Sequence, residues 1–184
     1  RAARGARPIS MDRRRGGHVD DAEVFALRQR ALEQMHRWRQ SPVRGFVGGR
    51  IDLISHQLYI AREVGNRLSP RVLLADEVGL GKTIEAGLIV HRQLVTGRAA
   101  RVLILVPESL VHQWFVELLR KFNLWVHIFD EERCAAIEKG LPEANPFLDD
   151  QVILCSIDFL AAHPERAEQA KEAGWDLLVV DEAH

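Results

Sequence analysis

The chain has 184 residues, of which 47% are hydrophobic and 28% are charged, and its formal net charge is −1 at pH 7. This length suffices for one globular domain with its own core. No apolar run approaches the roughly 18 residues of a membrane span, and the N-terminus lacks a secretory pattern. Together with the wide spacing of Cys134 and Cys155, these features predict a soluble, cytoplasmic protein. The eight histidines lack the spacing of a zinc site.

Charge is divided unevenly along the chain. Residues 1–50 hold twelve arginines and five acidic side chains, whereas residues 51–184 hold thirteen basic and twenty-one acidic side chains. A basic front would suit nucleic-acid phosphates or an acidic partner. A solvated leader without a dedicated partner explains residues 1–15 equally well, because glycine and arginine recur there without an apolar pattern. We expect residues 1–19 to be a flexible basic leader.

Residues 20–50 are expected to form a helix followed by a connector. Apolar side chains recur there at steps of three and four residues, which places them on one stripe of a helix. The stripe consists of Val24, Leu27, Ala31, Met35 and Trp38. Asp20 or Asp21 would cap the start of the helix, and Ser41 with Pro42 would end it. Such a stripe predicts that the helix docks on a partner surface.

Residues 51–184 alternate short apolar runs with helical stretches. The runs are 72–75, 102–106, 152–155 and 177–180, with a weaker fifth at 125–129. Continuous apolar runs are typical of strands covered on both faces, as in parallel sheets. Helices are expected over 55–68, 82–96 and 109–121, the last capped by Ser109. This alternation predicts an α/β domain in which helices flank a parallel sheet.

A glycine-containing loop joins the first expected strand to the helix that begins near Lys82. The loop consists of Asp76, Glu77, Val78, Gly79, Leu80, Gly81, Lys82 and Thr83. Glycines let backbone amides surround phosphates, and the helix N-terminus adds the positive end of its dipole. Lys82 would reach the β- and γ-phosphates and take part in catalysis, and Thr83 would bind Mg²⁺. Asp76 departs from the general Walker A pattern, but the strand, loop and helix order favours phosphate binding over a chance match.

The last expected strand ends in two carboxylates, Asp181 and Glu182, as in a Walker B motif. Asp181 would hold Mg²⁺, and Glu182 would orient and deprotonate the attacking water. Ligands of open parallel sheets bind at this edge. A solvated strand end explains the pair equally well when it is considered alone. Its occurrence in one chain with Lys82 and Thr83 favours a nucleotide and Mg²⁺ site.

The loop at 76–83 and the run at 181–184 together resemble helicase superfamily 2. The loop is similar to that of the Swi/Snf-type branch, in which Asp76 is normal. Segments 41–46, 56–58, 84–87 and 123–124 resemble the bacterial RNA polymerase-associated members of this branch, although Ser55 stands where they usually have proline. The resemblance covers about residues 20–184. It implies that residues 51–184 are a truncated RecA-like P-loop lobe that uses ATP and Mg²⁺, tracks DNA or RNA, and remodels or recycles RNA polymerase at the nucleoid.

The resemblance also implies roles for single residues. Gln57 corresponds to a glutamine that reads the adenine edge, with an ordinary polar residue on the helix as the alternative. The segment 106–110, with Gln113 and Trp114, is similar to a motif that contacts the nucleic-acid backbone, although core packing explains Trp114 better. Ser156 belongs to a second such motif, with a helix cap as the alternative. His184 would couple the nucleotide to the other lobe.

Two other functions fit the same residues. One is a different superfamily 2 helicase or a restriction-type translocase, and the other is a non-catalytic nucleotide-binding interaction module. The resemblance implies a second lobe with an arginine finger after His184. We therefore expect ATP hydrolysis by the full-length protein, whereas residues 1–184 alone should bind nucleotide weakly and hydrolyse very little of it.

Overall fold

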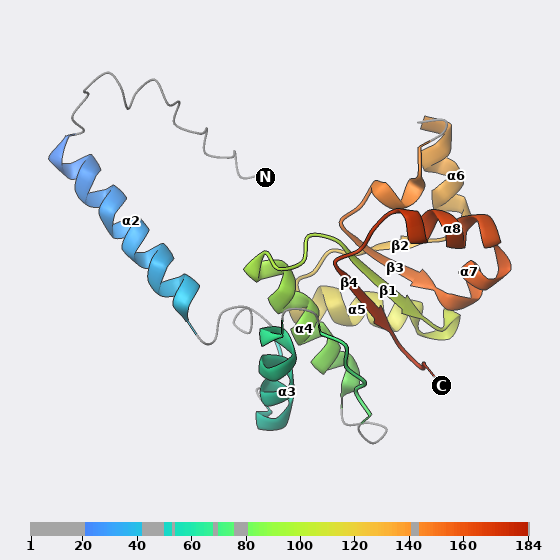
Figure 1. Cartoon of the computed structure of the whole chain (residues 1–184), viewed down its shortest axis with the longest axis horizontal. Helices are drawn as coiled ribbons and strands as arrows, with labels where there is room; N and C mark the ends of the chain where they lie inside the picture. The colour runs from blue at the N-terminus through green and yellow to red at the C-terminus, as the bar shows by residue number, and fades with distance from the viewer. Residues whose placement is uncertain are drawn as a thin grey trace. The chain divides into compact units, whose positions relative to one another are not determined.

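The computed structural model describes residues 21–41, 50–52, 54–67, 70–75, 81–140 and 144–183, with only the backbone given for 38–40. The chain divides into two compact units, Arg1–Ser41 and Pro42–His184. The described part of the first unit is a single helix, and the second unit holds the sheet and all the other elements (Figure 1). The expected leader at 1–19 and most of the expected connector lie outside the described residues.

The helix of the first unit, α2 (Ala22–Gln40), confirms the predicted helix. Asp21 caps it, because its carboxylate accepts the backbone N–H of Glu23 at 3.4 Å. The described side chains of the apolar stripe, which exclude Trp38, are exposed, among them Leu27 at 64% and Met35 at 48%. The partner surface predicted for this stripe stays a prediction.

The second unit is built around a parallel sheet with the strand order β2-β3-β1-β4. The strands are β1 (Val102–Val106), β2 (His127–Phe129), β3 (Val152–Ser156) and β4 (Leu177–Val180). The central strand β1 pairs with β3 on one side and with β4 on the other, both in parallel. The predicted α/β class with a parallel sheet is therefore confirmed.

Helices cover both faces of the sheet (Figure 1). They are α3 (Ser55–Asn66), α4 (Lys82–Thr96), α5 (Val111–Phe122), α6 (Glu131–Gly140), α7 (Ile157–Ala162) and α8 (Pro164–Glu172), with 3-10 turns at Glu108–Leu110 and Pro146–Leu148. Side chains of β1 alternate between two cores: Val102, Ile104 and Val106 pack with α3, α4 and α5, whereas Leu103 packs with the residues of α6 and α8. Burial on both faces explains why β1 and β3 read as continuous apolar runs, whereas β4 leaves Leu178 and Val180 exposed.

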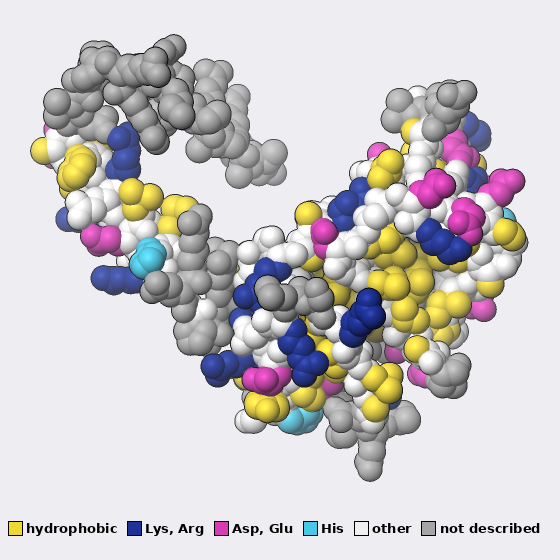
Figure 2. Space-filling view, in the orientation of Figure 1, with side chains coloured by type: hydrophobic (Ala, Val, Ile, Leu, Met, Phe, Trp, Pro, Cys, Tyr) yellow, Lys and Arg dark blue, Asp and Glu magenta, His cyan; other side chains and the backbone are white. Residues whose placement is uncertain are grey.

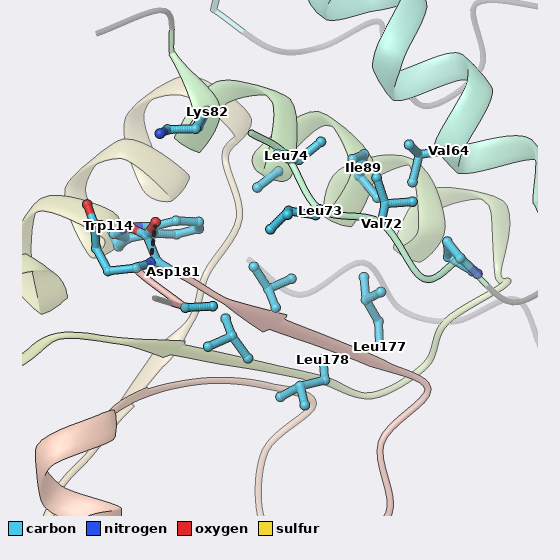
Figure 3. Close-up of a pocket in the computed structure, with 16 residues that line it drawn as sticks. Val64, Val72, Leu73, Leu74, Lys82, Ile89, Trp114, Leu177, Leu178 and Asp181 are labelled. Carbon is cyan, nitrogen blue, oxygen red and sulfur yellow. Dashed lines mark hydrogen bonds between the residues drawn. The ribbon is translucent and has the colours of Figure 1, made fainter. Parts of the chain in front are cut away.

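The first expected strand, at 72–75, is absent, because this stretch is described as extended chain without sheet pairing. Val72 is 43% exposed and Leu73 is 79% exposed. A cavity, rather than a paired strand, separates these residues from β4 (Figure 3). The strand prediction was wrong for the described part of the domain, because an apolar run becomes a strand only where another strand accepts its hydrogen bonds.

The helix expected at 109–121 begins two residues later than predicted, at Val111. Ser109 does not cap it, because this exposed residue lies within the preceding 3-10 turn, and the N-cap of α5 is Leu110, which makes no side-chain cap hydrogen bond. The cap interpretation of Ser109 was therefore wrong. The other helices expected in this unit begin where predicted: α4 spans Lys82–Thr96 as expected, and α3 ends two residues early, at Asn66.

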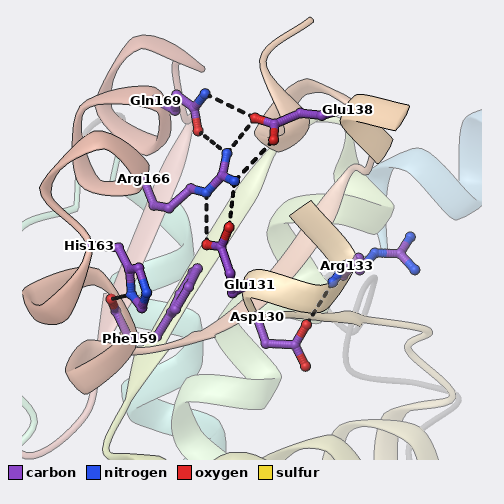
Figure 4. Close-up of polar contacts among 8 residues, drawn as sticks. All are labelled: Asp130, Glu131, Arg133, Glu138, Phe159, His163, Arg166 and Gln169. Carbon is purple, nitrogen blue, oxygen red and sulfur yellow. Dashed lines mark hydrogen bonds and ion pairs between the residues drawn. The ribbon is translucent and has the colours of Figure 1, made fainter. Parts of the chain in front are cut away.

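An arginine joins the two helices that cover the second core. The Arg166 guanidinium of α8 donates to Glu131 at 2.7 and 3.0 Å and also to Glu138, and both glutamates belong to α6 (Figure 4). Hydrogen bonds from Arg166 hold the pKa of both carboxyl groups below the ordinary value of 4.5. Only 11% of the Arg166 side chain is exposed. A charge that is largely buried needs opposite charges beside it, and Glu131 and Glu138 supply them.

Both cysteines are buried and carry free thiols. Burial raises the pKa of Cys134 to about 11 and raises that of Cys155 further, so both remain thiols near neutral pH. The buried thiol predicted at Cys155 is thus confirmed. None of the described helices is both long and apolar enough to cross a lipid bilayer.

Candidate functional site

A cavity of about 510 Å³ lies between the extended stretch at 70–74 and strand β4 (Figure 3). Its lining combines aliphatic and charged side chains. Most of the lining is aliphatic, from Val64, Val72, Leu73, Leu74, Ile89 and residues 177–180. The polar side chains are Lys82, Asp181 and Glu182. Hydrophobic side chains also gather on the surface over β4, where Leu178 is 54% exposed (Figure 2).

Lys82 is placed by the glycine that precedes it. Gly81 has φ +84°, a left-handed conformation that favours glycine, and its carbonyl accepts the N–H of Ile84 at 2.8 Å. Helix α4 therefore begins at Lys82, and its first N–H groups and positive dipole end lie where the lysine side chain enters the cavity. This arrangement attracts anions. The phosphate-binding role of Lys82 stays a prediction. The loop residues Asp76, Glu77, Val78, Gly79 and Leu80 lie outside the described residues.

The two acidic residues follow β4 at the carboxyl edge of the sheet. The Asp181 N–H donates to the Leu105 carbonyl of β1 at 2.9 Å, which extends the strand pairing by one residue. Glu182 then turns away from the strand with φ 51°, an uncommon conformation for a residue with a side chain. Its N–H donates to Oδ1 of Asp181 at 3.0 Å. The structure thus brings Asp181, Glu182 and Lys82 to one cavity, as the two motifs predicted.

One contact of Asp181 was missed by the sequence analysis. The indole N–H of Trp114 in α5 donates to Oδ2 of Asp181 at 2.8 Å. Trp114 is only 3% exposed and belongs to the main core, so the core-packing interpretation is confirmed and stacking on a base is excluded in this conformation. The only signal in the sequence was that a buried tryptophan needs an acceptor for its N–H.

Gln57 lies on α3 beside the start of α4. It is only 3% exposed, and a Cβ added at Gly81 would lie 2.7 Å from its Nε2 atom. Its neighbour His56 lies 3.7 Å from Glu85, a fully buried carboxylate of α4. Gln57 is therefore a buried polar residue. Its side-chain amide lies next to Gly81, the last glycine of the predicted phosphate loop. Its predicted role in reading adenine stays a prediction.

The donor atoms at this edge fit Mg²⁺, which prefers hard oxygen ligands. Among the described residues, each Asp181 oxygen accepts one hydrogen bond, which leaves a second lone pair for a cation. Thr83, the other predicted ligand, is half-buried in the first turn of α4, next to Lys82. A hydroxyl and a carboxylate held by two separate elements are a suitable pair for an ion that also binds phosphate oxygens.

The two segments expected to contact nucleic acid lie side by side. The carboxylate of Asp158 accepts the N–H of Glu108 at 3.0 Å, which joins the start of α7 to the 3-10 turn before α5. Within these segments, Ser109 is exposed, whereas Ser156 is buried and its hydroxyl accepts the N–H of Phe159. Ser156 is thus a helix cap in this structure. His184 lies outside the described residues.

The parallel sheet with helices on both faces, and polar residues at its carboxyl edge, define an α/β RecA-like lobe. The SNF2-related domain family matches residues 29–184, so the chain belongs to this family. The predicted Swi/Snf-type relationship is confirmed.

Several bacterial proteins are similar to this chain. It is 59% identical over 174 residues to the RNA polymerase-associated protein RapA of Vibrio cholerae serotype O1 (strain M66-2) and of Vibrio vulnificus (strain YJ016). It is 58% identical to RapA of Photobacterium profundum. Each match covers 95% of this chain and 18% of the relative. The chain therefore spans less than a fifth of the length of these relatives.

Proposed function

We propose that this chain is the ATP-binding lobe of a nucleic-acid-dependent ATPase that remodels or recycles RNA polymerase in the bacterial cytoplasm. The observation that carries the proposal is that Lys82, Asp181 and Glu182 all line one cavity. A cation at a helix N-terminus and two carboxylates at a strand end suit a phosphate chain with its metal ion. The aliphatic remainder of the cavity suits neither phosphate nor metal.

The proposed chemistry assigns one task to each residue. Lys82 binds the β- and γ-phosphate oxygens, and Gln57 reads the adenine edge. Thr83 and Asp181 hold Mg²⁺, which would offset the charge that builds up on the phosphate oxygens. Glu182 orients a water molecule in line with the γ-phosphate and accepts its proton. Glu182 follows the proposed cation ligand Asp181 directly and lines the same cavity, which supports this assignment.

The proposed partners come from the relatives. Proteins named RNA polymerase-associated are 58–59% identical to this chain over almost its whole length. We infer RNA polymerase and DNA or RNA as partners of the longer protein, with nucleic acid contacted near Ser109 and Gln113. A pull-down of RNA polymerase with the longer protein at moderate salt tests this inference, and a failure to associate would leave a generic translocase.

Nucleotide binding is tested on the chain itself. Lys82→Ala should weaken the binding of a fluorescent ATP analogue with Mg²⁺ at least about tenfold, because it removes the charge that faces the phosphates. Lys171→Ala is the matched control, since this exposed lysine on α8 pairs only with the neighbouring Glu168 among the contacts of the described residues. Equal affinities of wild type and Lys82→Ala would refute the proposed site.

A further inference from the structure

A buried tryptophan holds the carboxylate that follows β4 (Figure 3). Trp114 and Asp181 are 67 residues apart in the sequence, and they are joined by a hydrogen bond of 2.8 Å from the indole Nε1 to Oδ2. The indole N–H can only donate, and a buried one needs an acceptor. An ionised carboxylate is a strong acceptor, so this bond restrains the Asp181 side chain more than a neutral partner would.

Two further polar groups of Asp181 are also held. Its N–H donates to Leu105 of β1, and its Oδ1 accepts the N–H of Glu182. The backbone is thus anchored to the sheet, while Trp114 anchors the outer end of the side chain from α5. Because both oxygens are engaged from different directions, rotation of the carboxylate would break at least one of these bonds.

We propose that Trp114 is a positioning residue, whose indole N–H holds the Asp181 carboxylate in the orientation that binds a divalent cation beside the nucleotide. The inference rests on the proposed function, because it takes Asp181 as the cation ligand. Removing a group that orients a metal ligand typically lowers metal affinity about 10- to 100-fold. Helix α5 begins directly after the 3-10 turn Glu108–Leu110, so the same helix connects the expected polymer-contacting segment to the cation ligand.

The test measures how much a cation improves ATP binding by the full chain. ATP affinity is determined by calorimetry in EDTA and then with Mn²⁺. Trp114→Phe keeps an aromatic ring in the core but removes the N–H, so the gain supplied by Mn²⁺ should fall about tenfold while metal-free binding is unchanged. Trp175→Phe is the matched control, because that indole donates to the Ala170 carbonyl at 2.7 Å and does not line the cavity.

Asp181→Asn separates the two ways in which the idea can fail. If this substitution leaves the Mn²⁺ gain intact, the cation site is misassigned and the role of Trp114 falls with it. If Asp181→Asn removes the gain but Trp114→Phe keeps it, the proposed function stands and Trp114 only packs the core.

A second measurement covers the case in which Trp114→Phe does not fold. In the wild-type chain labelled with ¹⁵N, the indole N–H resonance of Trp114 should shift when Mg²⁺ and ATP are added, and that of Trp175 should not. An unmoved Trp114 resonance at saturating ligand would overturn the proposal, since a group bonded to the cation ligand senses the bound charge.

Discussion

Gly87→Ala tests the packing of α4 on α5, because two known effects of the substitution oppose each other. Gly87 is buried on α4 and faces the ring of Phe122, which is only 2% exposed. A Cβ added at Gly87 would lie 2.7 Å from Cζ of that ring and closer still to Cε2. Real Cβ atoms do not approach so closely, so either the ring or the helix must move.

The magnitude follows from the two effects. Replacing glycine with alanine inside a helix stabilises it by about 1 kcal/mol, whereas overpacking a core costs about 1 to 3 kcal/mol. The ring is enclosed by the main core, so we expect the upper part of that range and a net loss of about 1 to 2 kcal/mol. For a domain of this size, the melting temperature should fall by roughly 2 to 8 °C.

Thermal and urea unfolding of the chain measure this loss. Gly140→Ala is the control, because a Cβ at this residue, the last of α6, would meet no atom of the described residues within 4 Å. It should leave the stability unchanged or raise it slightly. Phe122→Leu combined with Gly87→Ala should cost less than the sum of the single substitutions, since the smaller side chain relieves the clash. A higher melting temperature for Gly87→Ala would show that helix propensity outweighs packing, and would refute the close approach of these helices.

Three further predictions concern the site and the second core. Glu182→Gln in the longer protein should keep ATP bound but lower hydrolysis by about 10²- to 10⁴-fold, because the amide cannot take the proton of the attacking water. Steady-state ATPase and binding assays check this prediction, and unchanged turnover would contradict it. Gln57→Ala should raise the Michaelis constant for ATP about tenfold and narrow the preference for ATP over GTP, as measured with both nucleotides. An unchanged ratio would leave Gln57 as a packing residue. Arg166→Leu should lower the melting temperature at pH 7. Since Arg166 depresses the pKa of Glu131 and Glu138 below 4.5, its stabilisation is present above that pH and is lost as the pH falls. The deficit of the variant should therefore shrink as the pH falls below about 4.5, and a deficit independent of pH would argue for lost packing instead.

Local patterns in the sequence were enough for most of the elements. The helix α4 and the strands β1 and β4 have the expected bounds, because the apolar residues of α4 recur with the helical period and each of the two strands is a continuous apolar run. The candidate site could be predicted for the same reason. Lys82 follows a glycine at the start of a helix, and Asp181 directly follows an apolar strand. Both were expected at one edge of the sheet, because parallel strands direct their carboxyl ends to the same edge.

Features that depend on distant parts of the chain were decided only by the tertiary structure. Residues 72–75 have the composition of a strand, yet they lie across the cavity from β4 and pair with no strand of the described residues. The reason is that the neighbours of a segment determine whether its backbone finds hydrogen-bond partners. The approach of Gly87 to Phe122 and the bond from Trp114 to Asp181 each join elements that are far apart in the sequence. Such contacts leave no periodic pattern, because they arise from the three-dimensional packing of α4 and α5 on the sheet.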